Sequence, residues 1–325
     1  MRCMTFCIIC PKLVDSRMDQ PTYRNTQPKS MTNNNSKLKG EPSKEERLPD
    51  SRDGFIMIQR LYNGGAWNRG IFLVGDEASK KLAICKMLYP LIGSRNAFRE
   101  SGILSRLQGH DNMVHMYRHC ITYSENRIYM EYCKGGDLAN IIDAYKEACC
   151  RIPDSFIWHV AESLMRALCT THMGIWKEDR IEAPRKDWDP IYHGDIHERN
   201  VFITTPFTDS PYPRIVLGDF GSSHHNFGEL DSNDQEFVEQ LRKRDIVNFG
   251  ATIHALRRVG PGKLKYSDPE LDSLIIRCGT GMTDTSRIKI PFANEILGSI
   301  LRSRETVRSR IKLEPLIKDF CDRKL

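Results

Sequence analysis

Three oxygen-bearing side chains in the middle of the chain have the types and the spacing to act together. Asp195 stands five residues before Asn200 in the segment 193–200 (HGDIHERN), and Asp219 follows a short apolar run. A carboxylate can act as a base, whereas a carboxamide and a second carboxylate are hard oxygen ligands of the kind that Mg²⁺ prefers. The spacing therefore predicts a base at Asp195 beside a metal site made of Asn200 and Asp219.

The same residues carry a resemblance to a known family. The segment 193–200, followed by Asp219-Phe220-Gly221, resembles the catalytic-loop and metal-binding signatures of the protein kinase superfamily. The resemblance covers about residues 54–310 and implies an α+β, two-lobed fold, with a small antiparallel sheet and one regulatory helix beside a larger, mainly helical lobe. It implies transfer of the γ-phosphoryl group of ATP, with Mg²⁺, to a protein hydroxyl of serine or threonine, with Asp195 accepting the proton.

A lysine and a glutamate upstream match two further elements of that family. Residues 83–86 (AICK) resemble its lysine-bearing strand, and Glu100 follows Lys86 by fourteen residues in a predicted helix. An ammonium held by a carboxylate can be aimed at phosphate groups, whereas a free one is a mobile point charge. The resemblance therefore implies a catalytic ion pair between Lys86 and Glu100.

The resemblance also implies a nucleotide pocket. Residues 127–138 (RIYMEYCKGGDL) resemble the hinge between the lobes. The turn at 63–71 (NGGAWNRGI) departs from the family's glycine pattern, although its glycines still allow backbone amides to approach phosphate. Ile84 replaces a usual alanine and would crowd the roof of the pocket. In this assignment Met130 is the gatekeeper, the backbones of Glu131 and Cys133 bind adenine, Asp137 reaches the ribose, and Gly64, Gly65, Gly70, Ile71, Ile84 and Lys86 complete the site.

Strands and helices must position these side chains. Apolar runs at 55–58, 71–74, 82–85 and 127–132 predict an antiparallel sheet, and residues 94–107 predict a helix with Ser94 as its N-cap. In the second half, apolar residues recur every four positions from Phe156 to Leu168, which predicts a long helix packed on one face. Later helices are expected at about 236–258, 268–278 and 291–310.

Composition divides the chain into three parts. Residues 11–52 lack periodic apolar positions and are rich in Pro, Ser, Asn and Lys, so we expect a disordered basic leader over 1–52. An N-terminal lobe with the ATP-binding sheet and helix is expected over 53–133, and a C-terminal helical lobe with the catalytic loop over 134–325. Insertions at 174–192 and 204–214 indicate surface loops, the first with Trp176 and Trp188 as candidate anchors.

Charge, hydropathy and cysteine usage narrow the class of protein. Residues 1–52 and 301–325 each carry a formal charge of +4 and the remainder carries −2, which gives the net charge of +6, so we expect no nucleic-acid partner. No apolar run reaches the ~18 residues of a membrane span. The eleven cysteines are scattered in apolar contexts, which favours an intracellular protein, cytoplasmic or nuclear, over a disulfide scaffold.

Two departures from the family pattern concern regulation and substrate docking. Gly194 occupies the place of an arginine that pairs with a phosphate on the activation segment, so we expect activity that does not depend on that phosphorylation. Only 26 positions separate Asp219 from Asp245, without an A-P-E sequence between them, which reduces the platform for a peptide substrate. Asp245 matches a buried helix aspartate that holds the catalytic loop.

Two other functions stay open at this stage. Aminoglycoside and choline kinases resemble the chain at His-Gly-Asp-x-His, whereas the hinge and Asp-Phe-Gly look more like protein kinases. An ATP-binding pseudokinase or scaffold is favoured by the irregular glycine turn, by Ile84 and by the short activation segment. Against it, a scaffold has no chemical need to keep the lysine, the glutamate and the three oxygen-bearing side chains together.

Overall fold

The computed structural model describes most of the chain, and the described residues belong to one compact unit that spans Leu48–Leu325. The described residues are 53–62, 68–90, 93–176, 184–204, 212–225, 232–260, 268–279 and 289–308. The leader predicted over 1–52 lies outside them, as do Gly64 and Gly65 of the predicted phosphate turn.

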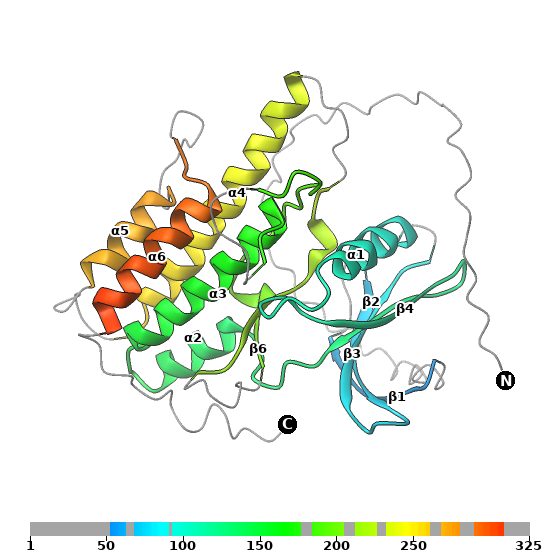
Figure 1. The fold of residues 1–325 in the computed structure, drawn as a ribbon. Helices are drawn as coiled ribbons and strands as arrows, with labels where there is room; N and C mark the ends of the chain where they lie inside the picture. Colours follow the sequence, from blue (N-terminus) through cyan, green and yellow to red (C-terminus); the bar gives the residue numbers. More distant parts are fainter. Residues whose placement is uncertain are drawn as a thin grey trace, which may run out of the picture. The chain divides into compact units, whose positions relative to one another are not determined.

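Five strands form one antiparallel sheet in the order β1-β2-β3-β5-β4 (Figure 1). Alternation along β3 sends Cys85 into a small core on one face of the sheet, and Lys86 to the opposite face. On the Cys85 face, the ring of Phe55 stacks on that of Tyr129, with centroids 4.3 Å apart. The strands are β1 (Phe55–Tyr62), β2 (Asn68–Asp76), β3 (Leu82–Leu88), β4 (Met116–Ile121) and β5 (Asn126–Glu131).

The helix α1 (Ser94–Arg106) joins β3 to β4 and carries Glu100 on its buried face. The predicted N-cap at Ser94 is wrong, because Gly93 is the N-cap and no side chain caps the helix. The Ser94 hydroxyl instead accepts a hydrogen bond from Asn126 Nδ2 at 3.0 Å, which ties the start of α1 to β5.

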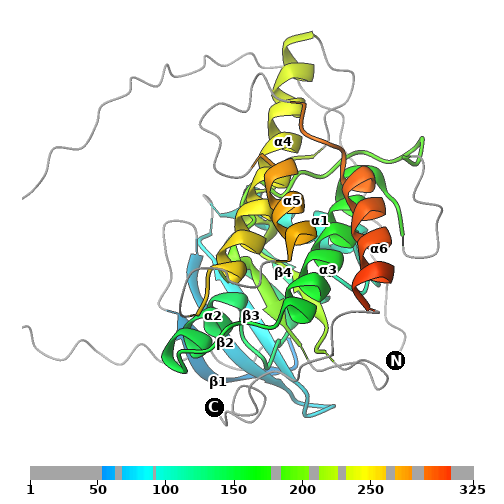
Figure 2. The same ribbon diagram turned by 90° about the vertical axis from the view of Figure 1, so that its left-hand side faces the viewer.

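The remaining helices pack around one long central helix. In Figure 2, α3 (Asp154–Met173), α4 (Ser232–Arg257), α5 (Pro269–Arg277) and α6 (Ala293–Arg308) run side by side. The predicted apolar face of α3, from Phe156 to Leu168, is buried, but the prediction of packing on one face is wrong, because Ile157, Ala161 and Met165 on other sides of this central helix are buried as well. The shorter α2 (Leu138–Glu147) precedes α3.

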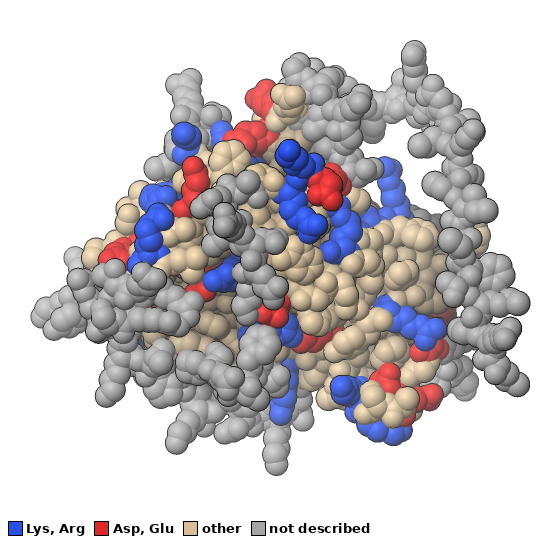
Figure 3. All heavy atoms as spheres, in the orientation of Figure 1, with Lys and Arg blue, Asp and Glu red and all other residues tan. Residues whose placement is uncertain are grey.

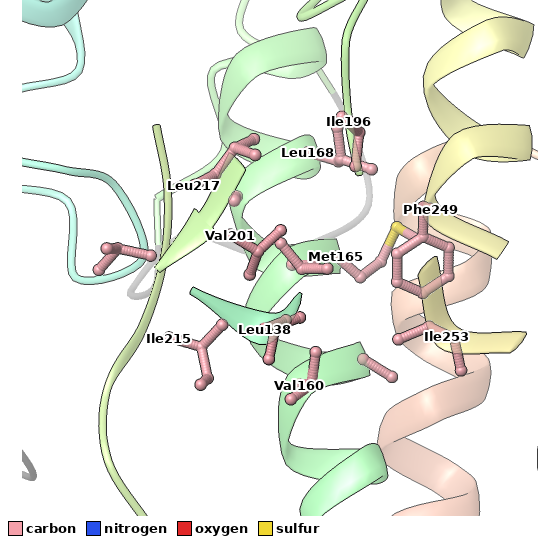
Figure 4. Packing of buried hydrophobic residues seen from close by; sticks show 14 of the residues in the cluster. Leu138, Val160, Met165, Leu168, Ile196, Val201, Ile215, Leu217, Phe249 and Ile253 are labelled. Atoms are coloured by element: carbon pink, nitrogen blue, oxygen red, sulfur yellow. The ribbon is translucent and has the colours of Figure 1, made fainter. Parts of the chain in front are cut away.

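Two short strands hold the segment with the candidate catalytic residues. The antiparallel pair β6 (Val201–Ile203) and β7 (Ile215–Leu217) follows the 3-10 turn Glu198–Asn200 and precedes the 3-10 turn Phe220–Ser222. Figure 4 shows Val201 and Leu217 of these strands pointing into the core beside Met165 and Leu168 of α3. The expected α+β class, a small sheet with one helix followed by a helical lobe, is confirmed.

The surface offers two observations on the expected partners. On the face in Figure 3, basic and acidic side chains of the described residues are interspersed. Among the helices of the described part of the chain, none combines the length and the apolar character needed to cross a membrane.

Candidate active site

A three-way contact joins β3, α1 and the turn after β7. Nζ of Lys86 donates to both carboxylate oxygens of Glu100, at 2.8 and 2.9 Å, and to Oδ1 of Asp219 at 2.7 Å. The predicted ion pair is therefore formed, and it includes Asp219. Lys86 and Glu100 are buried, whereas the side chain of Asp219 is 45% exposed.

The charges in this contact stabilise one another. Burial by itself lowers the pKa of Lys86, but the carboxylates of Glu100 and Asp219 outweigh burial and raise the pKa above its usual value. For Asp219, burial works toward a higher pKa, and the ammonium of Lys86 reverses this and holds the pKa below its usual value. At neutral pH, Lys86 therefore carries a positive charge and Asp219 carries a negative charge.

Asp195 and Asn200 lie together on the loop before β6. Asn200 Nδ2 donates to the Asp195 carbonyl at 2.8 Å and to its Oδ2 at 3.3 Å. The carbonyl of Asn200 accepts from the amide of Gly218, next to Asp219, at 3.0 Å. The predicted base and the two predicted metal ligands are thus brought to one place, and the Asp195 side chain is 46% exposed.

A buried histidine and a buried aspartate fix the shape of this loop. The amide of Asp195 donates to Nδ1 of His193 at 3.2 Å, so Nε2 carries the proton and donates to the Gly218 carbonyl at 2.9 Å. Burial lowers the pKa of His193, which favours this neutral form. Asp245 of α4 accepts from the amides of His193 and Gly194, both at 2.7 Å.

A pocket of about 410 Å³ opens between the sheet and the hinge. Seven of the predicted nucleotide contacts line it, together with Glu100 and Asp219: Ile71, Ile84, Lys86, Met130, Glu131, Cys133 and Asp137. Gly70 is not among the lining residues. Gly70 lies in β2 beside β1 and has a φ of +153°. A Cβ at this position would come within 3.0 Å of the Tyr62 carbonyl oxygen.

Comparison with known proteins decides the family. The protein kinase domain family matches residues 73–238, about half of the chain. The chain belongs to the protein kinase family. It is 29% identical over 168 residues to the serine/threonine-protein kinase Nek1 of Toxoplasma gondii, covering 48% of this chain and 10% of that protein.

Two further kinases are similar over longer stretches. The probable serine/threonine-protein kinase nek2 of Dictyostelium discoideum is 32% identical over 190 residues, which cover 54% of this chain and 41% of that protein. The human serine/threonine-protein kinase Nek2 is 26% identical over 250 residues, which cover 68% of this chain and 49% of that protein. The matched part of this kinase-family chain spans less than half the length of each of these three relatives.

The hinge of this kinase-family chain has several of its polar atoms already engaged. The Glu131 amide donates to the His115 carbonyl at 2.8 Å, and the Cys133 carbonyl accepts from the Gly136 amide at 3.0 Å. Asp137 caps α2, with one carboxylate oxygen 2.9 Å from the Asn140 amide. Burial raises the pKa of Asp137, although this hydrogen bond works against the change.

Besides Tyr132, Gly136 and Asn140 in and just after the hinge segment, four apolar or aromatic residues of the kinase pocket were not predicted from the sequence. Val114 precedes β4, Phe202 lies in β6, and Leu61 and Tyr62 end β1. Each is apolar or aromatic and stands outside the quoted motifs, so only the folded arrangement shows that it faces the pocket. A signal was present for Phe202, because it follows the catalytic loop by two residues.

The residues in place fit ATP and Mg²⁺. The pocket combines apolar walls with a buried ammonium at one end, as a purine and its phosphates require. Within the described residues, no group of three or more His, Cys, Asp or Glu side chains forms a metal site. Asn200 and Asp219 offer two oxygen donors, and Mg²⁺ commonly takes one or two protein ligands with substrate phosphates and water.

Proposed function

We propose that this chain transfers the γ-phosphoryl group of ATP to a serine or threonine hydroxyl of a protein substrate. The observation that carries the proposal is the contact of one buried ammonium with two carboxylates, Lys86 with Glu100 and Asp219, in the lining of the pocket. The names of the related kinases support a protein substrate over a small molecule.

Each site residue has a role in this proposal. Lys86, oriented by Glu100, binds the phosphates, and Asp195 orients the acceptor hydroxyl and takes its proton. Asn200 and Asp219 would hold Mg²⁺. When bound, Mg²⁺ neutralises charge on the phosphate oxygens. Most of the acceleration in such a site comes from positioning and electrostatic stabilisation, which the hydrogen-bonded loop around Asp195 favours.

The nucleotide contacts can be assigned more closely than from the sequence. We assign adenine to the Glu131 carbonyl and the Cys133 amide, because the other backbone group of each residue is engaged. Met130 and Ile84 border the adenine, and Asp137 faces the ribose with the oxygen that does not cap α2. Ile71 borders the pocket, and we assign Gly64 and Gly65 to the turn near the phosphates, with Gly70 just after it in β2.

The proposal also covers the division of the chain into lobes and the location of the protein in the cell. The boundary between the two lobes is placed between residues 133 and 134, after β5 and before α2, with the leader over 1–52 ahead of them. An intracellular location is supported by the seven cysteines of the described part of the chain, all of which are free thiols.

Labelled ATP tests the proposal. Transfer to a generic protein acceptor in the presence of Mg²⁺ is compared between the purified wild-type chain, the variant Asp195→Asn and the matched control Glu147→Gln. Glu147 lies on the exposed end of α2. We expect Asp195→Asn to lower transfer by at least about 10²-fold and Glu147→Gln to leave it unchanged. Equal transfer by wild type and Asp195→Asn contradicts the assignment of the base.

The acceptor separates the remaining alternatives. Labelling of protein at serine or threonine supports the proposal, whereas labelling of aminoglycosides or choline alone assigns a small-molecule kinase. Nucleotide binding without transfer to any acceptor assigns a pseudokinase.

A further inference from the structure

The connection between α3 and the catalytic loop contacts the C-terminal end of α1. Nη1 of Arg106, in the last turn of α1, lies 3.1 Å from Oδ2 of Asp189, and Nη2 donates to the Asp189 carbonyl. The guanidinium also lies over the ring of Trp188, 4.7 Å from its centroid. Arg106 is therefore held by a carboxylate, a carbonyl and an aromatic face at once.

Trp188 is in turn fixed to the central helix of the larger lobe. Its Nε1 donates to the carbonyl of Thr171 in α3 at 2.9 Å. Gly174, which ends α3 with a φ of +68°, lies so close to the indole that a Cβ there would come within 2.6 Å of it. Through Trp188, the end of α1 is attached to a rigid element rather than to a free loop.

The same carboxylate also faces the segment after Asp219. Nδ1 of His225 lies 3.7 Å from Oδ2 of Asp189. Farther along α1, the guanidinium of Arg99 donates to the carbonyl of Gly221. Two arginines of α1, on either side of Glu100, thus connect the helix to segments of the chain that lie outside the sheet.

The position of α1 decides whether the predicted site works, because Glu100 must reach Lys86. In the family pattern, a guanidinium at the position of Gly194 pairs with a phosphate on the activation segment. Gly194 has no such group, and its φ of +76° suits glycine. The buried face of α1, with Ala97, Ile103 and Leu104, packs in the core, and the contacts of Arg106 add a fixed point at the C-terminal end of the helix.

We propose that Arg106, Trp188 and Asp189 form a brace that keeps α1 in the position where Glu100 contacts Lys86. The three are positioning residues, since they act on the phosphates only through that ion pair. The effect on transfer rests on the proposed kinase activity, whereas the effect on α1 does not. The ion pair between Arg106 and Asp189, with side chains 29% and 37% exposed, contributes little by itself to overall stability, so a large loss of transfer would distinguish a brace from a surface bridge.

The experiment compares Arg106→Gln, Asp189→Asn and the double variant with wild type. Arg166→Gln is the control, because Arg166 forms an ion pair with Glu162 on α3, with side chains 22% and 13% exposed, away from α1. We expect kcat to fall roughly three- to thirtyfold in Arg106→Gln, with a smaller change in the KM for ATP and an unchanged melting temperature. The double variant should be no worse than Arg106→Gln, and Arg106→Lys should recover part of the loss.

Hydrogen exchange provides a readout that needs no activity. Amides of residues 94–106 should exchange faster in Arg106→Gln than in wild type and in Arg166→Gln, because a released α1 opens more often. If the two glutamine variants match in exchange and in kcat, the brace is overturned. If wild type transfers no phosphate, faster exchange still supports the brace and the failure belongs to the proposed function, whereas unchanged exchange overturns the brace.

Discussion

Nζ of Lys86 lies 2.7 Å from Oδ1 of Asp219, and the same nitrogen contacts both oxygens of Glu100. One ammonium therefore compensates a fully buried carboxylate and at the same time orients a candidate metal ligand. Because these two roles depend on the same atom, a single replacement of Lys86 removes both, and a second substitution at Glu100 is needed to separate them.

Replacement of Lys86 should cost both stability and activity. In Lys86→Met, the buried carboxylate of Glu100 loses its ammonium partner, so we expect the free energy of unfolding to fall by about 3–5 kcal/mol. Transfer should fall at least about 10²-fold. In Lys86→Met/Glu100→Gln, denaturant unfolding should show most of the stability restored while transfer stays lost. Lys146→Met, at an exposed ion pair of α2, is the control; recovered activity in the double variant contradicts the role of Lys86.

Removal of divalent metal should stop transfer and spare nucleotide binding. Asn200 and Asp219 offer only two donors, so a chelator competes readily with them. With EDTA we expect no labelled product and full recovery on addition of Mg²⁺, while a fluorescent adenine nucleotide still binds. Asp219→Asn should behave like the chelated wild type. Undiminished transfer in EDTA would exclude the metal assignment.

Shortening Ile84 should improve nucleotide binding. Ile84 lines the pocket from β3 and replaces the alanine that the family usually has there. If the longer side chain crowds adenine, Ile84→Ala should lower the Kd for ATP roughly three- to tenfold in a titration. Leu82→Ala, at the exposed start of the same strand, is the control. Weaker binding in Ile84→Ala would make the isoleucine a contact instead of an obstacle.

Stability should fall as the pH drops below about 6.5. Burial is the main cause that lowers the pKa values of His193, His224 and His225 below the ordinary 6.5. Below pH 6.5 the unfolded chain therefore binds more protons than the folded chain. The stability that the neutral histidines contribute is complete above pH 6.5 and is lost as the pH falls toward their folded pKa values. The loss is at most about 1.4 kcal/mol per pH unit for each histidine. The measurement is the free energy of unfolding at pH 7.5 and 5.5.

Two variants test the source of that dependence. His193→Gln should reduce the difference between pH 7.5 and pH 5.5, since the imidazole that must stay neutral is gone. His119→Gln, on exposed β4, should leave the difference unchanged. A steeper dependence in His193→Gln would contradict the assignment.

The sequence predicted the elements whose side chains alternate or recur strongly. Four of the five strands and the helix after β3 follow from apolar runs, and three later helices lie within a few residues of their predicted ranges. The strand β4 was missed because Tyr117, Arg118 and His119 are exposed and give no alternating apolar pattern. The cap of α1 was misassigned because the Ser94 hydroxyl bonds Asn126, a partner 32 residues away.

The site was predictable where one motif carries one chemical role. Lys86, Glu100, Asp195, Asn200 and Asp219 come together as their spacing and the resemblance imply. Contacts that depend on packing could not be predicted, such as Phe202 in the pocket and the ion pair of Glu131 with Arg214, whose partners are 83 residues apart. The contacts of the brace also depend on packing, although the sequence marks Trp188 as a candidate anchor.

The three bonds of Asp245 also bear on the order of folding. His193, Gly194 and His172 lie 51 to 73 residues before this aspartate, so the loop around Asp195 gains these hydrogen bonds only once Asp245 is in place. During synthesis, every proposed catalytic and metal-binding side chain leaves the ribosome before Asp245 does. A nascent chain that has not yet reached α4 therefore contains all of these groups but not the carboxylate that shapes their loop, which separates the appearance of the residues from the onset of activity.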